Sequence, residues 1–295
     1  MKTNSLIFLC LLLFICGCGN SDQSSPPSKP TGGELVIGVD EALMPAIDAA
    51  VTVFTAVYPE ASITPLYLSE KAATEKLLTN KIQTAVLFRS LTEKEKEYIL
   101  ESLGHRVTSC RLGFDSIVAV TGKINPVSAV LCKDIKSILT GKVLYWKQLD
   151  NAFEDNSPVS IIIPGSSDID RLIYNTVPQV SPASTYELDR TGDVIGYVLN
   201  NPITIGLVNK SRVINKDNLL PDIKIIARIN KNLDDSSTED YLLLEINAII
   251  HEPFTGLGSG FISFLAGRKG QLILSKAGIT PVKPIERDIN ISGSF

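Results

Sequence analysis

The chain has 295 residues, of which 44% are hydrophobic and 20% are charged, and its formal net charge at pH 7 is −4. This length is sufficient for two domains of usual size, and the composition is that of a globular protein. A mildly acidic chain without a basic cluster is not expected to bind a nucleic-acid backbone, although a single arginine in a cleft can still bind a small anion.

Residues 1–17 are predicted to be a signal peptide. A lysine precedes an apolar run of ten residues, 6–15, which is too short to span a bilayer comfortably and is typical of a signal-peptide core. The run ends in ICGCGN, in which Gly17 precedes Cys18, and this segment resembles the bacterial lipobox. The resemblance implies that Cys18 receives a diacylglyceryl group and anchors the mature chain, with residues 18–33 as a disordered tether that has almost nothing to bury. The alternative is a short apolar N-terminus of a cytosolic protein.

The segment from residue 34 to residue 88 predicts a βαβαβ order, which is the start of a mostly parallel α/β sheet. Short apolar segments predict strands over 35–39, 62–68 and 84–88, and a short helix is expected over 72–78. The longer helix after the first strand has apolar residues at steps of three and four, which bury one helix face. These residues are Leu43, Ile47, Ala50, Val51, Phe54 and Val57.

The rest of the chain continues this alternation of helices and strands. A charged segment, 92–104, predicts a helix whose Glu and Lys side chains form a solvated face, and Gly141 is expected to end a helix that starts near residue 132. The remaining predicted elements are strands over 115–122, 161–163, 202–208 and 241–250, a helix from about Ile169, and a C-terminal helix broken near residues 267–270.

The chain has two cysteines beyond the predicted anchor and two histidines. Cys110 and Cys132, the cysteines beyond the predicted anchor, form either a disulfide or two buried thiols, and the sequence gives no distance that decides between these. His105 and His251 are isolated in the sequence, without the spacing of metal ligands. We therefore interpret both histidines as surface or structural residues and predict neither a metal site nor a cofactor.

The segment SIIIPGSSDIDRLIYN, residues 160–175, joins a strand to a helix through Pro164 and Gly165. Two serines and an aspartate follow that turn, as at a helix start that holds an anion, but the same residue types cap any helix. A nucleophilic serine requires a general base, and PGSSD does not match the G-x-S-x-G pattern. We therefore do not expect an enzyme.

Five sequence segments occur in the order in which one known family has them: LFRSLTEKE, FDSIVAVTGKINPV, ILTGKVLYWKQL, NNPITIGLV and GSGFISFLAGRKGQLILSKAGITPV. By these motifs the chain from residue 34 onward resembles the PstS-like, phosphate-binding substrate-binding proteins of ABC transporters, and in particular a divergent lipoprotein branch of them. The resemblance implies an α/β protein with the two-lobed type II periplasmic-binding-protein fold, each lobe a mixed, mostly parallel sheet flanked by helices. It places residues 34–115 and 230–295 in lobe 1 and residues 116–229 in lobe 2.

In that family a dehydrated oxyanion lies between the lobes. Helix N-termini offer unpaired N–H groups, an arginine supplies a planar fork of donors, and an aspartate accepts the proton that hydrogen phosphate still carries. The resemblance implies that the ligand contacts are Arg89, Ser90, Asp115, Ser166 and Ser167. Further candidates for ligand binding or for lining the cleft are Asp40, Glu41, Glu70, Asp168 and Arg171, and Glu70 is expected to pair with Arg89 in an empty cleft.

The resemblance predicts an extracytoplasmic, lipid-anchored, monomeric protein that binds a small oxyanion, phosphate first, for the permease of an ABC importer. The alternative is a protein of the same fold that has lost phosphate binding and acts as a partner-binding or signalling subunit, or binds another ligand. The segment Asp40–Glu41–Ala42 favours the alternative, because the family has S-S-T at this place and two carboxylates oppose a bound anion.

Overall fold

The computed structural model describes residues 29–150, 153, 156–165, 167–177, 179–215, 218–230, 233 and 242–282. The predicted signal peptide, the predicted lipid-modified Cys18 and residues 18–28 of the predicted tether lie outside the described residues. Along the described parts of the chain, no helix combines the length and the apolar character that a membrane span requires.

The first lobe begins with three parallel strands. β1 (Gly33–Asp40) pairs with β2 (Ala61–Leu68) on one side and with β3 (Thr84–Leu87) on the other. Helices α1 (Met44–Val57) and α2 (Glu70–Leu78) connect these strands. The predicted βαβαβ order is therefore confirmed.

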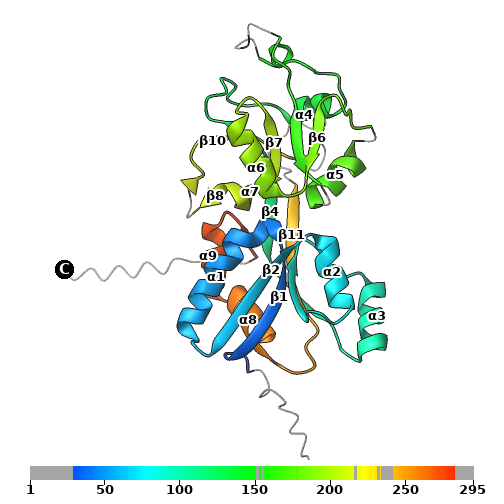
Figure 1. The fold of residues 1–295 in the computed structure, drawn as a ribbon, viewed down its shortest axis with the longest axis vertical. Helices are drawn as coiled ribbons and strands as arrows, with labels where there is room; N and C mark the ends of the chain where they lie inside the picture. The colour runs from blue at the N-terminus through cyan, green and yellow to red at the C-terminus, as the bar shows by residue number, and fades with distance from the viewer. Residues whose placement is uncertain are drawn as a thin grey trace, which may run out of the picture.

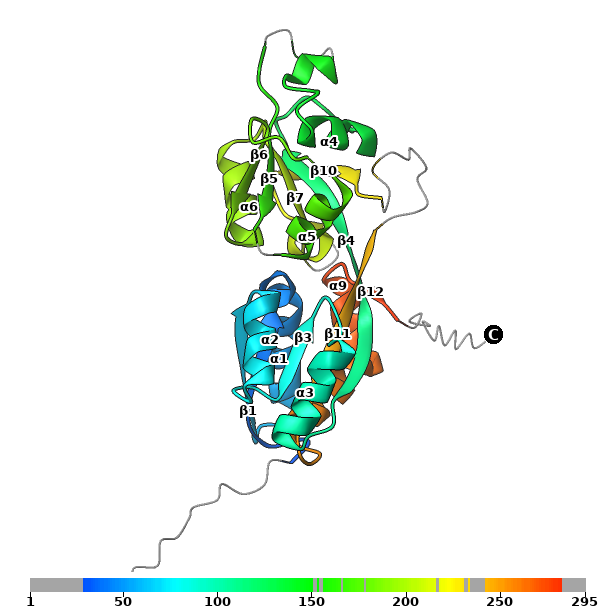
Figure 2. The same ribbon diagram turned by 90° about the vertical axis from the view of Figure 1, so that its right-hand side faces the viewer.

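One long strand, β4 (Thr108–Gly122), belongs to both lobes. Its first part pairs antiparallel with β11 (Leu243–Ile250), which also pairs with β3. Its second part pairs antiparallel with β7 (Ile205–Asn209) and β10 (Ile223–Arg228). With β5 (Ile161–Pro164) and β6 (Thr185–Leu188), these strands form one sheet in the order β2-β1-β3-β11-β4-β7-β5-β6, and β4 runs from the lower lobe into the upper lobe in Figure 2. The sequence predicted only the second part of this strand.

The second lobe has a parallel core of its own. β5 (Ile161–Pro164) pairs in parallel with β6 (Thr185–Leu188) and with β7. Helices α4 (Cys132–Leu139), α5 (Asp168–Thr176) and α6 (Thr191–Asn200) lie around these strands in the upper lobe of Figure 1. Strand β6 and helix α6 were not predicted, because the edge strand β6 has exposed residues in its middle and lacks an apolar run.

The remaining helices complete the first lobe. α3 (Glu93–Leu103) follows β3, and the C-terminal helix is broken at Gly267 into α8 (Leu257–Ala266) and α9 (Arg268–Lys276), as predicted. In α4, Gly141 lies just past the C-cap with a φ of 72°, which confirms the predicted helix end.

The short elements of the two lobes are η1 (Glu41–Leu43), η2 (Trp146–Gln148), α7 (Lys210–Val213), β8 (Ile214–Asn215), β9 (Asn218–Leu219) and β12 (Thr280–Pro281).

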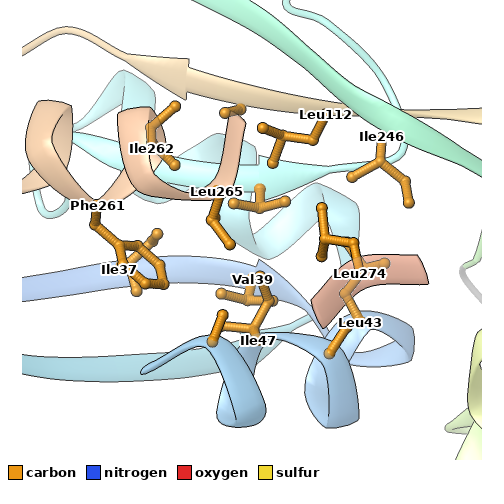
Figure 3. Packing of buried hydrophobic residues seen from close by; sticks show 14 of the residues in the cluster. Ile37, Val39, Leu43, Ile47, Leu112, Ile246, Phe261, Ile262, Leu265 and Leu274 are labelled. Atoms are coloured by element: carbon orange, nitrogen blue, oxygen red, sulfur yellow. The ribbon is translucent and has the colours of Figure 1, made fainter. Parts of the chain in front are cut away.

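The core of the first lobe lies between β1 and three helices. Figure 3 shows Ile37 and Val39 of β1 among Ile47 of α1, Phe261 of α8 and Leu274 of α9, and each of these side chains is at most 1% exposed. The predicted apolar face of α1 is buried at its start and middle, but its last member, Val57, is exposed at the helix end. Among the described residues, each of the two lobes is held by apolar clusters of its own, two in each lobe.

The two cysteines do not contact each other as a disulfide, whereas the two histidines lie in contact. Cys110 and Cys132 are free thiols, so the structure contains two thiols rather than a disulfide. His251 is fully buried, with its Nδ1 3.3 Å from Nδ1 of His105 and its Nε2 3.1 Å from the carbonyl oxygen of Ile82. Burial lowers the pKa of His251, which favours its neutral form. The two histidines form a structural pair, a contact that their isolation in the sequence did not indicate.

The aromatic packing of lobe 1 can be tested at Phe261. Its ring is fully buried and meets the ring of Phe54 edge-on, with 5.4 Å between centroids and an interplanar angle of 84°. We expect Phe261→Ala to lower the free energy of unfolding by about 3–5 kcal/mol, because it leaves a cavity in a packed core. Phe254→Ala is the matched control, since Phe254 is 52% exposed. Urea unfolding followed by circular dichroism measures both variants, and an equal loss in the two would contradict the core described here.

Candidate ligand-binding site

A cavity of about 290 Å³ lies between the two lobes. Its described lining residues lie at or just after the carboxyl ends of β1, β2 and β3 in one lobe, and of β5, β6 and β7 in the other. Within each lobe these strands are parallel, so their carboxyl ends meet at one edge of the sheet. Such an edge is where ligands bind in open α/β sheets.

Several helices begin at this cavity. Five of its described lining residues are N-caps, which are Asp40 of η1, Ser69 of α2, Ser167 of α5, Arg190 of α6 and Asn209 of α7. The first N–H groups of a helix have no partner within the helix and carry a positive partial charge. The cleft therefore gathers hydrogen-bond donors from both lobes, an arrangement that suits an anion.

Ser167 caps α5 and also lines the cavity, but its one hydroxyl proton is already donated to Pro164, so an anion would have to replace that carbonyl oxygen. Its Oγ accepts from the N–H of Asp170 at 3.2 Å and donates to the carbonyl oxygen of Pro164 at 2.7 Å, while the residue also lines the cavity. Ser166 lies outside the described residues, and the side chain of Asp168 is likewise not described.

Asp40 places a carboxyl group in the cavity wall. It is 8% exposed and accepts a hydrogen bond from the N–H of Ala42 at 3.0 Å. Burial, together with the nearby negative charges of Glu41 and Glu70, raises the pKa of Asp40 to about 7 against the opposing effects of the Ala42 hydrogen bond and Arg212. Near neutral pH this carboxyl is therefore present in both its protonated and its ionised form.

Two carboxylates of the first lobe bind groups of the second lobe. Oε1 of Glu41 accepts from the N–H of Thr191 at 2.6 Å, and its Oε2 lies 4.0 Å from Nη2 of Arg212. Both carboxylate oxygens of Glu70 accept from Nη1 of Arg171, at 2.9 and 3.1 Å. These two contacts bridge the cleft.

The predicted ligand arginine, Arg89, is engaged within the first lobe. Its Nε donates to Glu70 at 2.8 Å, which is the pairing expected from the sequence. Its Nη1 and Nη2 donate to the two carboxylate oxygens of Glu95 at 2.8 and 2.9 Å, to the carbonyl oxygen of Ser90 and to Oγ1 of Thr74. All five N–H donors of the guanidinium thus have partners. The pair with Arg89 lowers the pKa of Glu95 to about 2, so Glu95 does not belong to the solvated face predicted for α3.

Asp115 lies at the middle of β4 and is 1% exposed. Its carboxylate accepts from Oγ of Ser211 at 2.6 Å, from the N–H of Ser116 at 2.7 Å and from the N–H of Ser211 at 3.3 Å. Burial raises the pKa of Asp115 to about 6, although these hydrogen bonds lower it. The geometry gives Asp115 a positioning role, because it ties β4 to the start of α7.

Some predicted residues line the cavity and others do not. Asp40, Glu41 and Ser167 are among its described lining residues, whereas Arg89, Ser90, Asp115, Glu70 and Arg171 are not. Their roles in ligand binding stay predictions. The lining residues that the sequence did not indicate include Ser69, Thr191 and Asn209. A serine directly before a helical segment is the usual N-cap signal and could have identified Ser69, but Thr191 follows an unpredicted strand.

Two α/β lobes that share one sheet and enclose a polar cleft define the class of periplasmic binding proteins. A family model described as a PBP superfamily domain matches residues 24–269, and the chain belongs to this superfamily. The family and fold class predicted from the sequence are thus confirmed. No curated protein matches the chain.

Three similar solved structures come from different bacteria. A putative phosphate ABC transporter substrate-binding protein with bound phosphate from Clostridium perfringens has a TM-score of 0.68 at 21% identity, covering 85% of this chain and 100% of that one. A phosphate binding protein from Stenotrophomonas maltophilia has a TM-score of 0.64 at 11% identity, covering 85% and 91%. An ABC-type phosphate transport receptor from Vibrio cholerae has a TM-score of 0.58 at 16% identity, covering 83% and 99%. At these identities the likeness establishes the fold.

The pH dependence of stability tests the environment of Asp40. In the unfolded chain this carboxyl ionises near its ordinary pKa of 3.8, whereas in the folded chain it ionises near 7. Its contribution to stability is therefore complete below pH 3.8 and is lost as the pH rises towards 7. We expect Asp40→Asn, which keeps a good N-cap, to raise the free energy of unfolding at pH 8 by up to about 4 kcal/mol and to change it little at pH 4.

Urea unfolding at both pH values measures this difference. Asp222→Asn is the matched control, because Asp222 is exposed and asparagine tolerates its positive φ of 63°. A gain of the same size at pH 4 and pH 8, or a similar gain in the control, would contradict the raised pKa of Asp40.

Proposed function

We propose that the protein is an extracytoplasmic solute-binding lipoprotein that binds a small oxyanion, phosphate first, in the interlobe cleft for an ABC importer. The observation that carries the proposal is the convergence of helix N-termini from both lobes on one cavity. N–H groups at helix starts are fixed before the ligand arrives, so they bind an anion without reorganising. The superfamily membership supports the same proposal.

The ionisable wall of the cavity favours an oxyanion that can carry a proton. A carboxyl that titrates near pH 7, as Asp40 does, donates a hydrogen bond when protonated and accepts one from hydrogen phosphate when ionised. Sulfate carries no proton at this pH and would face the ionised carboxylate with bare oxygens, so Asp40 would discriminate against it. Ser69, the cap of α2, is proposed as a hydroxyl contact from lobe 1, and Ser167, the cap of α5, as one from lobe 2 whose hydroxyl exchanges the Pro164 carbonyl oxygen for the ligand.

Closure of the lobes would accompany binding. β4 and β11 connect the lobes through an antiparallel ladder with one register shift between Ile246 and Asn247, while the contacts across the cleft include the side-chain bridges from Glu41 and Glu70. A few side-chain contacts are exchanged more easily than a strand ladder, so an opening movement would separate these bridges and bend the connecting strands. Arg89 would keep Glu70 oriented towards Arg171 during this movement.

Calorimetry with inorganic phosphate tests the ligand. The delipidated, folded protein should release or take up heat with phosphate in the micromolar range and bind sulfate more weakly. Ser167→Ala should weaken phosphate binding by about tenfold, the usual effect of one hydrogen bond to a charged group. Ser137→Ala is the matched control, because its hydroxyl donates to the carbonyl oxygen of Lys133 in α4, outside the described cavity lining. Absence of heat from folded protein would contradict the oxyanion proposal and favour the partner-binding alternative.

The proposed lipid anchor is tested at Cys18. Cys18→Ala should move the protein from the membrane fraction to the soluble fraction, because no other residue in the proposed anchor segment would carry the diacylglyceryl group. Cys10→Ala is the matched control, since Cys10 lies in the apolar run that is predicted to be removed, and it should leave the protein in the membrane fraction. Retention of the Cys18→Ala protein in membranes would overturn the lipoprotein proposal.

A further inference from the structure

The N-terminus of α6 is capped by a residue of the other lobe. Its N-cap residue, Arg190, makes no side-chain capping bond. Instead the N–H of Thr191 donates to the carboxylate of Glu41 at 2.6 Å, a contact between residues 150 positions apart. The short distance and the favourable end of the helix dipole are those of a charge-assisted hydrogen bond to an anion.

Arg212 lies directly over the same helix end. Its Nη2 is 4.0 Å from Oε2 of Glu41 and would be 2.9 Å from a Cβ placed on Gly192, so a side chain at position 192 would force the guanidinium to shift. The Nε of Arg212 is buried and has no hydrogen-bond partner among the residues that the structure describes. The guanidinium of Arg212 thus lies beside the Glu41 carboxylate, but this carboxylate does not satisfy all of its hydrogen-bond donors.

Asn209 is a second donor that Glu41 does not satisfy. This residue is 3% exposed and lines the cavity, and its Nδ2 has no hydrogen-bond partner within the described part of the chain. A buried amide donor without an acceptor is unfavourable and is rare in folded proteins. The wall of the cavity therefore lacks an acceptor atom that a ligand can provide.

We propose that Thr191, Asn209 and Arg212 form an oxyanion subsite, and that the carboxylate of Glu41 occupies it as the chain's own substitute for the ligand. This inference rests on the proposed function and deepens it by naming the donors and the internal competitor. A carboxylate has two oxygens, and those of Glu41 make one short contact and one at 4.0 Å. A tetrahedral oxyanion has four oxygens, enough to serve all three donors at once.

A bound oxyanion would displace the Glu41 side chain, because both groups are negatively charged. A bound oxyanion and the Glu41 carboxylate would face each other across a buried site, and like charges placed together in this way cost several kcal/mol in other interfaces, or a hundredfold and more in affinity. The ligand must therefore move Glu41 away from Thr191 before it can use that N–H group. Glu41 would then set the affinity for the oxyanion and join the lobes when no ligand is bound.

Neutralising Glu41 separates this inference from a purely structural role. We expect Glu41→Gln to bind inorganic phosphate at least about tenfold more tightly than the unaltered protein by calorimetry, because the competing charge is gone. Glu97→Gln is the matched control, since it removes the same charge from an exposed position on α3, and its affinity should not change. Tighter binding in Glu41→Gln alone supports the subsite.

A second measurement keeps the test valid if Glu41→Gln does not fold. In ¹⁵N-labelled unaltered protein, phosphate should shift the backbone amide signal of Thr191 and the side-chain amide signals of Asn209. Phosphate binding with unshifted signals at both residues, or with equal affinity in Glu41→Gln and Glu97→Gln, overturns the subsite and leaves the proposed function intact. No heat in any variant and no shifted signal overturns both.

Discussion

The position of the cleft depends on the two-sided pairing of strand β4. Up to Ser116 its residues pair with β11, and from Ile117 they pair with β7, so the strand changes partner just after Asp115. The buried Asp115 carboxylate binds both Ser116 and Ser211, and this fixes the start of α7 against the point where the lobes join. Because one strand serves both lobes, the carboxyl ends of their parallel strands face each other across that joint.

Within the cleft, helix termini and carboxylates act against one another. The N-termini of α2, α5 and α6 each contribute a positive partial charge of roughly half an elementary charge, which favours an anion. The carboxylates of Glu41 and Glu70 already have cationic or N–H partners, and burial keeps Asp40 partly protonated near neutral pH. The acidic segment at residues 40–41 is therefore largely compensated by the protein itself, so its presence does not decide against an anionic ligand.

Short sequence patterns predicted most of the helices and strands of lobe 1. They did not predict the contacts between distant residues that define the site. The strands and helices of lobe 1 follow from short apolar runs and from apolar residues such as Ile47 and Phe54 at helical spacing. β6 lacks such a pattern; α6 has Val194, Ile195 and Val198 at helical spacing but was not predicted, and Thr191 was missed with it. Glu95 was interpreted as part of a solvated face because nothing in its helix indicates that Arg89 lies within reach. Contacts between distant residues, such as Glu41 with Thr191, depend on how the lobes meet, which no single segment encodes.

Arg89 and Arg212, two of the arginines near the cleft, differ in how many of their hydrogen-bond donors have partners. All five N–H donors of Arg89 are hydrogen-bonded to partners in lobe 1, whereas the buried Nε of Arg212 has no hydrogen-bond partner among the described residues. A ligand that used Arg89 would first have to break its pairs with Glu95 and Glu70, and each such hydrogen bond between charged groups contributes about 1.5–3 kcal/mol. Arg212 carries no comparable cost, so the cation that faces an oxyanion is better placed in the second lobe. Lobe 2 would then hold the ligand, and lobe 1 would contribute the ionisable Asp40 and the contact between Glu70 and Arg171 that keeps the lobes together after Glu41 has moved.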